Sequence, residues 1–128
     1  MIEKTKINHV ALNSLDKEKA DIFFKQILGL DLKKTFTISP DLSQQIFGIK
    51  EEIQVLSYEN EYCRFEIFIT KEIPKLRFDH TCIMVKDKQN FIERCKKHKI
   101  EPICVKRNDK ILLFVRDLSN NLYEVKEA

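Results

Sequence analysis

The 128-residue sequence predicts an α+β protein of two similar halves, each consisting of a strand, a helix and three further strands. Three observations predict this. Apolar and polar residues alternate in several short segments, which is typical of strands with one buried face. In two longer segments the apolar residues recur at helical spacing. A histidine opens each half, and an apolar strand with a central glutamate follows later in both.

The first half spans about residues 1–70. Lys6–Asn13 alternates as a strand, with His9 and Ala11 on the face opposite Val10 and Leu12. Ser14–Asp16 offers a helix cap, and Lys17–Leu28 then carries apolar residues at helical spacing. These are Ala20, Phe23, Phe24, Ile27 and Leu28. Gly29 is a natural stop for this helix.

The rest of the first half contains three strands and a short helix. Asp31–Ile38 reads as a strand, and Ser39-Pro40-Asp41 opens a short helical segment over Leu42–Phe47 that Gly48 ends. Two strands follow on either side of a polar turn, at Glu52–Tyr58 and Tyr62–Thr70.

The second half, about residues 77–128, follows a connector at Lys71–Leu76 and repeats the order of elements. Asp87 begins its helix, which continues to about Lys97. The predicted strands of this half are Arg77–Val85, Pro102–Lys106, Ile111–Arg116 and Leu122–Lys126.

The two halves also match at particular residues. The register that places His9 on His80 places Asp16 on Asp87. Each half then ends in a strand with a glutamate between apolar neighbours, Glu66 in the first and Glu124 in the second. Identity between the halves is otherwise low, so the repeat rests on element order and on these polar positions.

Composition excludes several classes of protein. Lys+Arg total 23 and Asp+Glu 20, and the charges are interleaved, which does not favour nucleic acid as a partner. No signal peptide or membrane span is evident, so we expect a cytoplasmic protein with no membrane partner. The chain has only 2 glycines, too few for a glycine-rich phosphate loop. No cysteine pair has C-x-x-C spacing, and we expect reduced, mostly buried thiols.

Four polar residues share one surface of the predicted sheets. Because strand side chains alternate between faces, and the apolar faces need the helices to cover them, these four must lie on the other faces. They are His9, Glu66, His80 and Glu124. Two imidazoles and two carboxylates suit a divalent ion such as Zn²⁺, Ni²⁺, Co²⁺ or Fe²⁺. Any one of these residues alone would be interpreted as a structural or solvated residue. The metal prediction therefore depends on all four occurring at matched positions of the two halves.

Neighbouring residues on that surface are candidate substrate contacts. Arg64 and Phe68 share a strand face with Glu66, and Arg64 would be either a solvated charge or an anchor for an anionic group. Cys82 shares a face with His80, although a small buried apolar residue is the simpler interpretation. His98, in a lysine-rich helix end, is expected to be a solvated surface residue.

The chain resembles the vicinal oxygen chelate superfamily, which includes glyoxalase I, methylmalonyl-CoA epimerase, extradiol dioxygenases and fosfomycin- and bleomycin-resistance proteins. The resemblance lies in INHVALNSLDKEKADIFFKQILGLDL, FEIFI, FDHTCIMVKD and FVRDLSNNLYEVKE. It implies a single domain over residues 1–128, in which two βαβββ modules form a curved mixed sheet around a cleft with helices outside. It also implies the metal ligands His9, Glu66, His80 and Glu124, and often a homodimer. The sequence leaves open whether the site forms within one chain or between chains.

Two departures from the family pattern bear on the substrate. Leu118, Ser119 and Asn120 replace the usual Pro-Asp-Gly before the second metal glutamate. Asn13 and Thr70 stand where glutathione-using glyoxalases commonly carry an arginine and an asparagine. We therefore expect poor turnover of the methylglyoxal–glutathione hemithioacetal.

The resemblance implies a metal-dependent lyase or isomerase acting on a small substrate with two adjacent oxygens. The ion would stabilise an enediolate, and Glu124 or Glu66 would act as the base. The candidate substrate contacts are Arg64, Asn13, Phe68 and Cys82. An Fe(II) extradiol-type dioxygenase and a non-catalytic protein that binds a small molecule are the alternatives.

Overall fold

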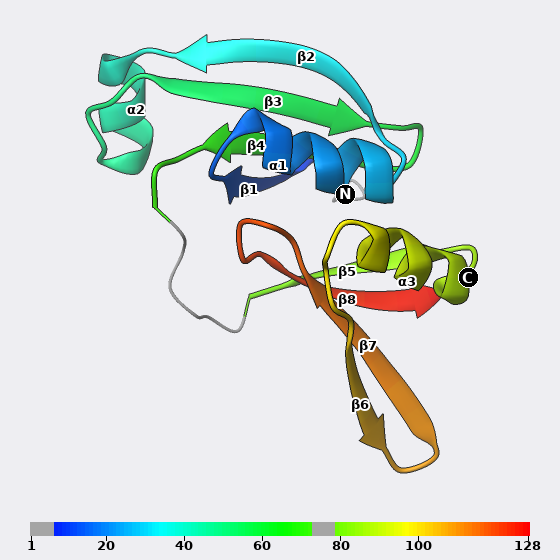
Figure 1. Cartoon of the computed structure of the whole chain (residues 1–128). Coiled ribbons are helices and arrows are strands. Elements are labelled where there is room, and N and C mark those ends of the chain that lie inside the picture. The colour runs from blue at the N-terminus through cyan, green and yellow to red at the C-terminus, as the bar shows by residue number, and fades with distance from the viewer. Residues whose placement is uncertain (1–6, 73–78) are drawn as a thin grey trace, which may run out of the picture.

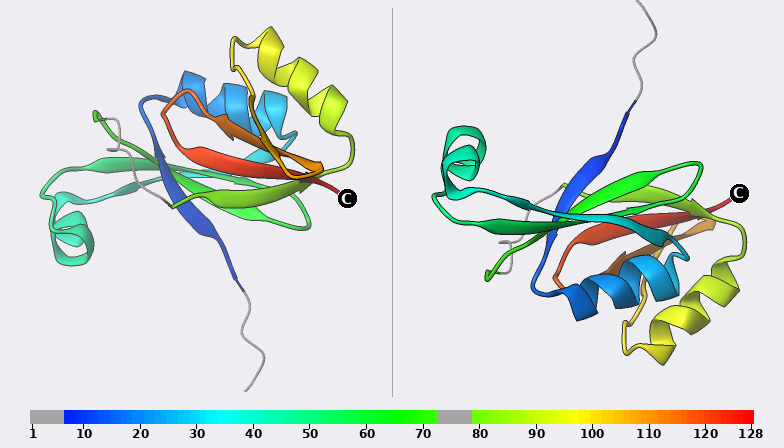
Figure 2. Two further views of the ribbon diagram at one scale, coloured as in Figure 1. Left: turned by 90° about the horizontal axis from the view of Figure 1, so that it is seen from below. Right: turned by 90° about the horizontal axis from the view of Figure 1, so that it is seen from above.

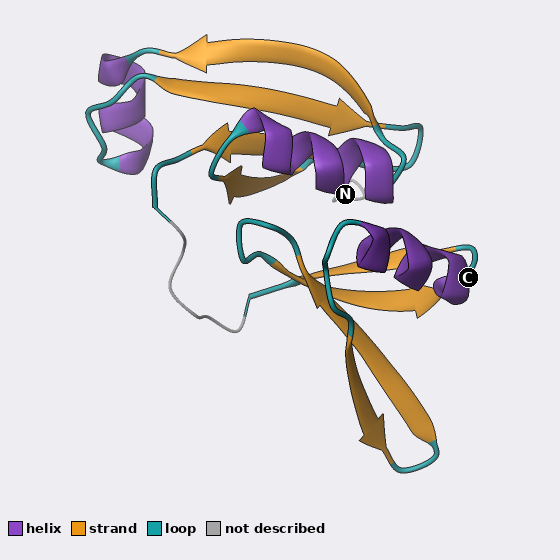
Figure 3. Cartoon of the chain, viewed as in Figure 1, coloured by secondary structure: helices purple, strands orange, loops and turns teal. Residues whose placement is uncertain are grey.

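The computed structural model describes residues 7–72 and 79–128, and the predictions for residues 6 and 73–78 lie outside this part of the chain. Figures 1 and 3 show strands and helices in the predicted order. The elements are β1 (Val10–Ser14), α1 (Lys17–Ala20), η1 (Asp21–Ile27), β2 (Asp31–Ile38), α2 (Pro40–Phe47), β3 (Ile53–Glu59), β4 (Arg64–Ile69), β5 (Thr81–Val85), α3 (Lys88–Lys97), β6 (Ile103–Arg107), β7 (Lys110–Arg116) and β8 (Leu122–Glu127).

The strands form two mixed sheets of 4 strands with the same topology, in the orders β1-β4-β3-β2 and β5-β8-β7-β6. In each sheet the opening strand pairs in parallel with the closing strand, β1 with β4 and β5 with β8. The other neighbours pair antiparallel. Figure 2 shows α1, η1 and α3 together on one side of the strands. The prediction of two βαβββ modules with outer helices is confirmed.

The helix starts follow the capping residues in the sequence. The side chain of Asp16 accepts a hydrogen bond from Lys19 N at 2.8 Å, and Asp87 accepts one from Asn90 N at 3.1 Å. The matched acidic residues of the two halves are therefore helix caps. Ser39 caps α2, and Gly48 ends it with a left-handed φ of 73°.

The first long helix departs from the predicted α-helical period. After α1 the chain continues as the π-helix η1, in which Leu28 N donates to Phe23 O at 2.9 Å. The adjacent Phe23 and Phe24 are both buried, with 0% and 1% exposure. The wider π turn lets these neighbours share the buried side, where a regular α-helix would separate them by a larger angle.

One hydrophobic core joins the two halves. The ring of Phe23 lies 4.6 Å from that of Tyr123, and the ring of Phe24 lies 5.3 Å from that of Tyr58. Arg94 Nε of α3 donates to Ile27 O of η1 at 3.0 Å. The helices therefore pack on each other as well as on the sheets. None of the helices in the described residues has the length and apolar character needed to cross a membrane.

The predicted alternation of strand faces is confirmed. In β4 Phe65 and Ile67 belong to the core, and in β8 Tyr123 and Val125 do. We call the other face of each sheet its open face. It carries Ala11, Glu66 and Phe68 in the first sheet, and Cys82, Met84 and Glu124 in the second.

The prediction of mostly buried thiols is wrong. Cys95 lies on the buried face of α3, and burial raises the pKa of its thiol to about 11. Cys63, Cys82 and Cys104 are exposed. Cys82 lies on the open face of the second sheet, which no helix of the described residues covers. An apolar strand sequence therefore does not by itself bury it.

Candidate metal centre

The structure places each predicted histidine beside the glutamate of its own half. Nε2 of His9 lies 3.5 Å from Oε1 of Glu66, and Nε2 of His80 lies 3.9 Å from Oε1 of Glu124. Both histidines stand one residue ahead of their strands, because the ladders begin with Val10 opposite Phe65 and Thr81 opposite Tyr123. Each sheet therefore carries one His–Glu pair.

The separations within each pair suit two ligands of one ion. Metal–ligand bonds of about 2.0–2.2 Å allow two donors of one ion to lie up to about 4.2 Å apart. Nδ1 of His9 also lies 2.9 Å from the amide oxygen of Asn8. An amide oxygen only accepts, so Nδ1 is the donor in this contact and Nε2 is the ring nitrogen that faces Glu66. This is the orientation that second-shell partners give a metal-binding histidine.

The two pairs do not join into one centre within the chain. Among residues 7–72 and 79–128, no three or more His, Cys, Asp or Glu side chains form a group able to hold a metal ion. Each pair remains partly exposed, with 37% of the His9 side chain and 40% of the His80 side chain accessible.

The turn before Glu124 is built around a buried carboxylate. Asp117 accepts hydrogen bonds from Ser119 N, Asn121 N, Asn121 Nδ2 and Tyr123 Oη, all at 2.9–3.0 Å. Burial raises the pKa of Asp117, against the opposite effect of these donors. Asn120 adopts a left-handed φ of 70°, a conformation that asparagine takes more readily than most other residues with a side chain.

The same turn binds the first half of the chain. Asn121 Nδ2 donates to Asn13 O at 2.6 Å, and Ser119 Oγ accepts from Leu15 N at 2.9 Å. Glu124 is thereby positioned by contacts from both halves. Sequence analysis predicted a turn at Ser119, Asn120 and Asn121 but gave Asp117 no role, although turn-forming residues between two strands were a signal for it.

The predicted substrate contacts are engaged with neighbouring residues. Asn13 Nδ2 donates to Thr70 Oγ1 at 3.1 Å, so the two residues compared above with the arginine and asparagine of glutathione-using glyoxalases bind each other here. Arg64 Nε lies 3.3 Å from Glu59 Oε2. Arg64 is thus an ion-paired charge rather than an uncompensated anchor.

Aromatic residues flank both pairs. Phe68, two residues after Glu66, contacts Phe47 of α2 edge-on at 5.4 Å. Phe114 pairs in register with Glu124, and its ring lies 6.3 Å from that of His80. Sequence analysis did not single out Phe47 or Phe114. The alternation in β7 could have placed Phe114 on the face of Glu124.

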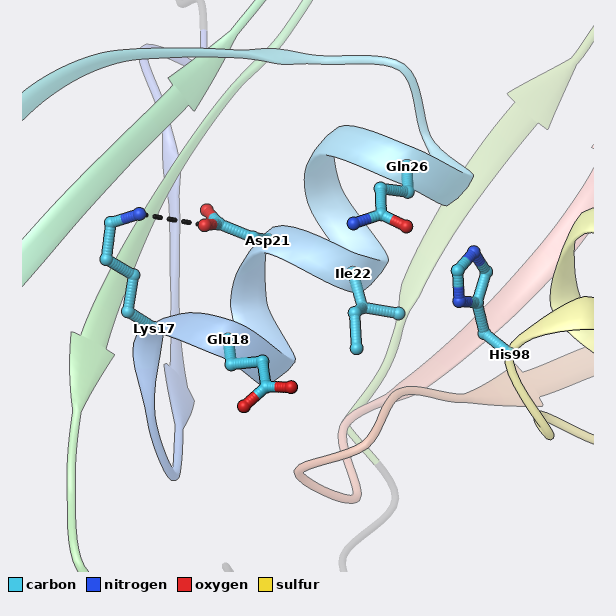
Figure 4. A pocket seen from close by; sticks show the side chains of 6 residues that line it. All are labelled: Lys17, Glu18, Asp21, Ile22, Gln26 and His98. Carbon is cyan, nitrogen blue, oxygen red and sulfur yellow. Dashed lines mark hydrogen bonds and ion pairs between the residues drawn. The ribbon is translucent and has the colours of Figure 1, made fainter.

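Two surface grooves lie near these elements. One runs between β1 and the start of β5 and includes His80, Arg116 and Asn121. The other lies between the first helix and the end of α3, as Figure 4 shows. His98 is half-buried at its edge, not fully solvated as predicted, and faces a helix surface that carries Lys17, Asp21 and Gln26. No predicted metal ligand lines this second groove.

Comparison with known proteins identifies the fold. No family model and no curated protein matches the sequence. Fosfomycin resistance protein FosX from Listeria monocytogenes is 13% identical, with a TM-score of 0.73 over 98% of this chain and 95% of that chain. A glyoxalase family protein from Bacillus cereus is 17% identical, with a TM-score of 0.74 over 98% and 95%. The chain has the vicinal oxygen chelate fold.

Other proteins with this fold give the same picture. A glyoxalase family protein from Enterococcus faecalis is 19% identical, with a TM-score of 0.70 over 94% of this chain and 95% of that chain. A variant of the Listeria FosX is known in complex with Mn(II) and 1S,2S-dihydroxypropylphosphonic acid. At these identities the likeness establishes the vicinal oxygen chelate fold and leaves the reaction to be argued from the site.

Proposed function

We propose that this protein is a metal-dependent lyase or isomerase of the glyoxalase type, acting on a small substrate with two adjacent oxygens. The observation that carries the proposal is the pair of His–Glu contacts at matched positions of the two sheets. A chance polar contact on one sheet needs no explanation. Its repetition at the same topological place, with donor atoms 3.5 and 3.9 Å apart, favours a shared ligand role.

The complete site would form between two copies of the chain. In a two-fold symmetric dimer, His9 and Glu66 of one copy would meet His80 and Glu124 of the other, and the symmetry would create two such sites. Exposed apolar side chains on the open face of the second sheet support burial against another surface. These are Met84, Ile103 and Val105, with 67%, 41% and 44% exposure.

The residues of the site would then have distinct tasks. His9 and His80 would hold the ion through Nε2, with Asn8 fixing the ring of His9. A bound divalent ion would supply Lewis-acid polarisation of the two substrate oxygens. Glu66 or Glu124 would accept the proton from the carbon beside the carbonyl and return it, which is general acid–base chemistry by a carboxylate. The Mn(II) bound by a FosX with this fold supports a divalent ion here.

Metal content tests the ligand set. We expect protein purified without added metal to contain a divalent ion, and His9→Ala and His80→Ala each to lose most of it, because a missing ligand is rarely replaced. His98→Ala is the matched control and should keep its metal. Full occupancy in both ligand variants would overturn the assignment. Iron in the native protein would favour the dioxygenase alternative, and absence of any metal would favour the non-catalytic binder.

Mixing the two variants tests the shared site. A dimer of one His9→Ala copy and one His80→Ala copy would contain one site with both histidines intact and one with neither. Random co-assembly should therefore restore about one quarter of all sites. If each site formed within one chain, every site in the mixture would still lack a histidine, and no tight binding would return.

A further inference from the structure

An apolar row lies on the open face of the first sheet, directly beside the proposed ligand Glu66. Strand register aligns Phe36 of β2 with Val55 of β3, and Val55 with Phe68 of β4. Glu66 lies in the next row on the same face, opposite Ser57. Residues two apart on a strand lie about 6.6 Å apart, so Phe68 is about that far along β4 from the proposed ligand Glu66. A group of the size of a phenyl ring can bridge this distance.

Helix α2 forms a wall over this row. The ring of Phe47 meets that of Phe68 at an interplanar angle of 77°, an edge-to-face contact. Val55 is fully buried although it lies outside the main core, and Ile38 and Ile53 beside it are also buried. Phe36, Phe47 and Phe68 keep part of their surface accessible. The apolar surface over Val55 is therefore already formed in the free protein, and the rings of Phe47 and Phe68 border it.

Three charged or polar residues near the row already have partners. Lys34 Nζ lies 5.1 Å from the centre of the Phe36 ring, a cation–π contact. Arg64 pairs with Glu59, and Asn13 binds Thr70. An anionic group placed here would compete with Glu59 for Arg64, whereas an apolar group would add burial without breaking a contact.

We infer that the substrate carries an aromatic or branched apolar group next to its two adjacent oxygens, and that Phe47 and Phe68 select for it. This inference rests on the proposed function for the position of the oxygens. The apolar group would lie over Val55 and against the two phenylalanine rings, on the α2 side of Glu66. A phosphonate or a glutathione moiety in this position is the competing outcome.

Two neutral diols provide the test. 1-Phenylethane-1,2-diol and propane-1,2-diol share the adjacent oxygens and differ in the apolar group. NMR titration would measure their affinities for the full chain, first without metal and then with Zn²⁺. We expect the phenyl compound to bind about ten-fold more tightly or better in both forms, because the row exists before the metal binds. 1S,2S-Dihydroxypropylphosphonate serves as the anionic comparison.

Variants test whether Phe47 and Phe68 cause the preference for the phenyl diol. Phe68→Ala and Phe47→Ser should reduce the ratio of the two diol affinities to about three-fold or less. Phe68→Leu should retain most of the affinity ratio, because leucine keeps this surface apolar. It is the control for a loss that comes from misfolding. Tyr62→Ala, which removes an aromatic ring with 85% exposure at the β3–β4 turn, should leave the ratio unchanged.

The outcomes separate the two proposals. Equal affinities for the two diols, tighter binding of the phosphonate, or an unchanged ratio in Phe68→Ala and Phe47→Ser would overturn the apolar selection. If Zn²⁺ strengthens neither diol while the ratio holds, the metal-dependent function fails and the apolar subsite stands.

Discussion

The hydroxyl of Tyr123 offers a direct measure of how much the buried turn stabilises the fold. Tyr123 is fully buried, and its Oη donates to Asp117 Oδ2 at 2.9 Å. Tyr123→Phe removes this donor and preserves the ring that packs 4.6 Å from Phe23. The change therefore tests one hydrogen bond to a buried carboxylate while apolar packing is held constant.

The structure sets the expected magnitude. Asp117 has 8% exposure, so water has little access to replace the lost donor. A hydrogen bond to a charged group contributes about 1.5–3 kcal/mol. With a urea m-value of about 1–3 kcal/mol/M, a loss of about 2 kcal/mol moves the unfolding midpoint by about 1 M. Because burial already raises the pKa of Asp117, the loss should be greatest at neutral pH and shrink as the pH falls through that raised value.

Tyr58→Phe is the matched control. Tyr58 is also fully buried and donates to Asp21 at 2.6 Å, but 22% of the Asp21 side chain is exposed and Lys17 also binds it. Water and Lys17 can compensate, so we expect a smaller loss of about 0.5–1.5 kcal/mol. Urea unfolding of both variants at pH 7 would decide the matter. A midpoint for Tyr123→Phe equal to or above that of Tyr58→Phe would refute the reasoning.

Three further predictions concern metal, substrate and pH. A chelator should lower the melting temperature without unfolding the protein, because the shared core does not depend on metal; complete unfolding at room temperature would contradict this. The methylglyoxal–glutathione hemithioacetal should be turned over poorly even with Ni²⁺ or Zn²⁺ added; efficient turnover that is lost in Arg64→Ala would show that Arg64 leaves Glu59 to bind the anion. Burial of Asp21 opposes its ionisation, but hydrogen bonds from Lys17 and Tyr58 hold its pKa below 3.8. This stabilisation is present above pH 3.8 and is lost as the pH falls through the lowered value, so the stability advantage of the native protein over Asp21→Asn should shrink in acid, and a constant difference would contradict the assignment.

Local patterns determined much of the fold and of the candidate site. Strand alternation placed Glu66 and Glu124 on the faces away from the helices, because side-chain direction in a strand depends only on position. Asp16, Ser39 and Asp87 marked the helix starts, because capping is a contact between residues three apart in sequence. The matched placement of His9 and His80 likewise followed from the repeat.

Other features depended on contacts between distant segments, and only the tertiary structure decided them. The π turn of η1 follows from the need to bury Phe23 and Phe24 together against Tyr123 and Tyr58. Cys82 is exposed because no helix within residues 7–72 and 79–128 covers its side of the sheet, and a strand pattern cannot predict which side is covered. The separation of the two His–Glu pairs was equally invisible in the sequence. Periodicity fixes the face on which a side chain lies, whereas the distance between residues of different sheets depends on how the helices of both halves pack into one core.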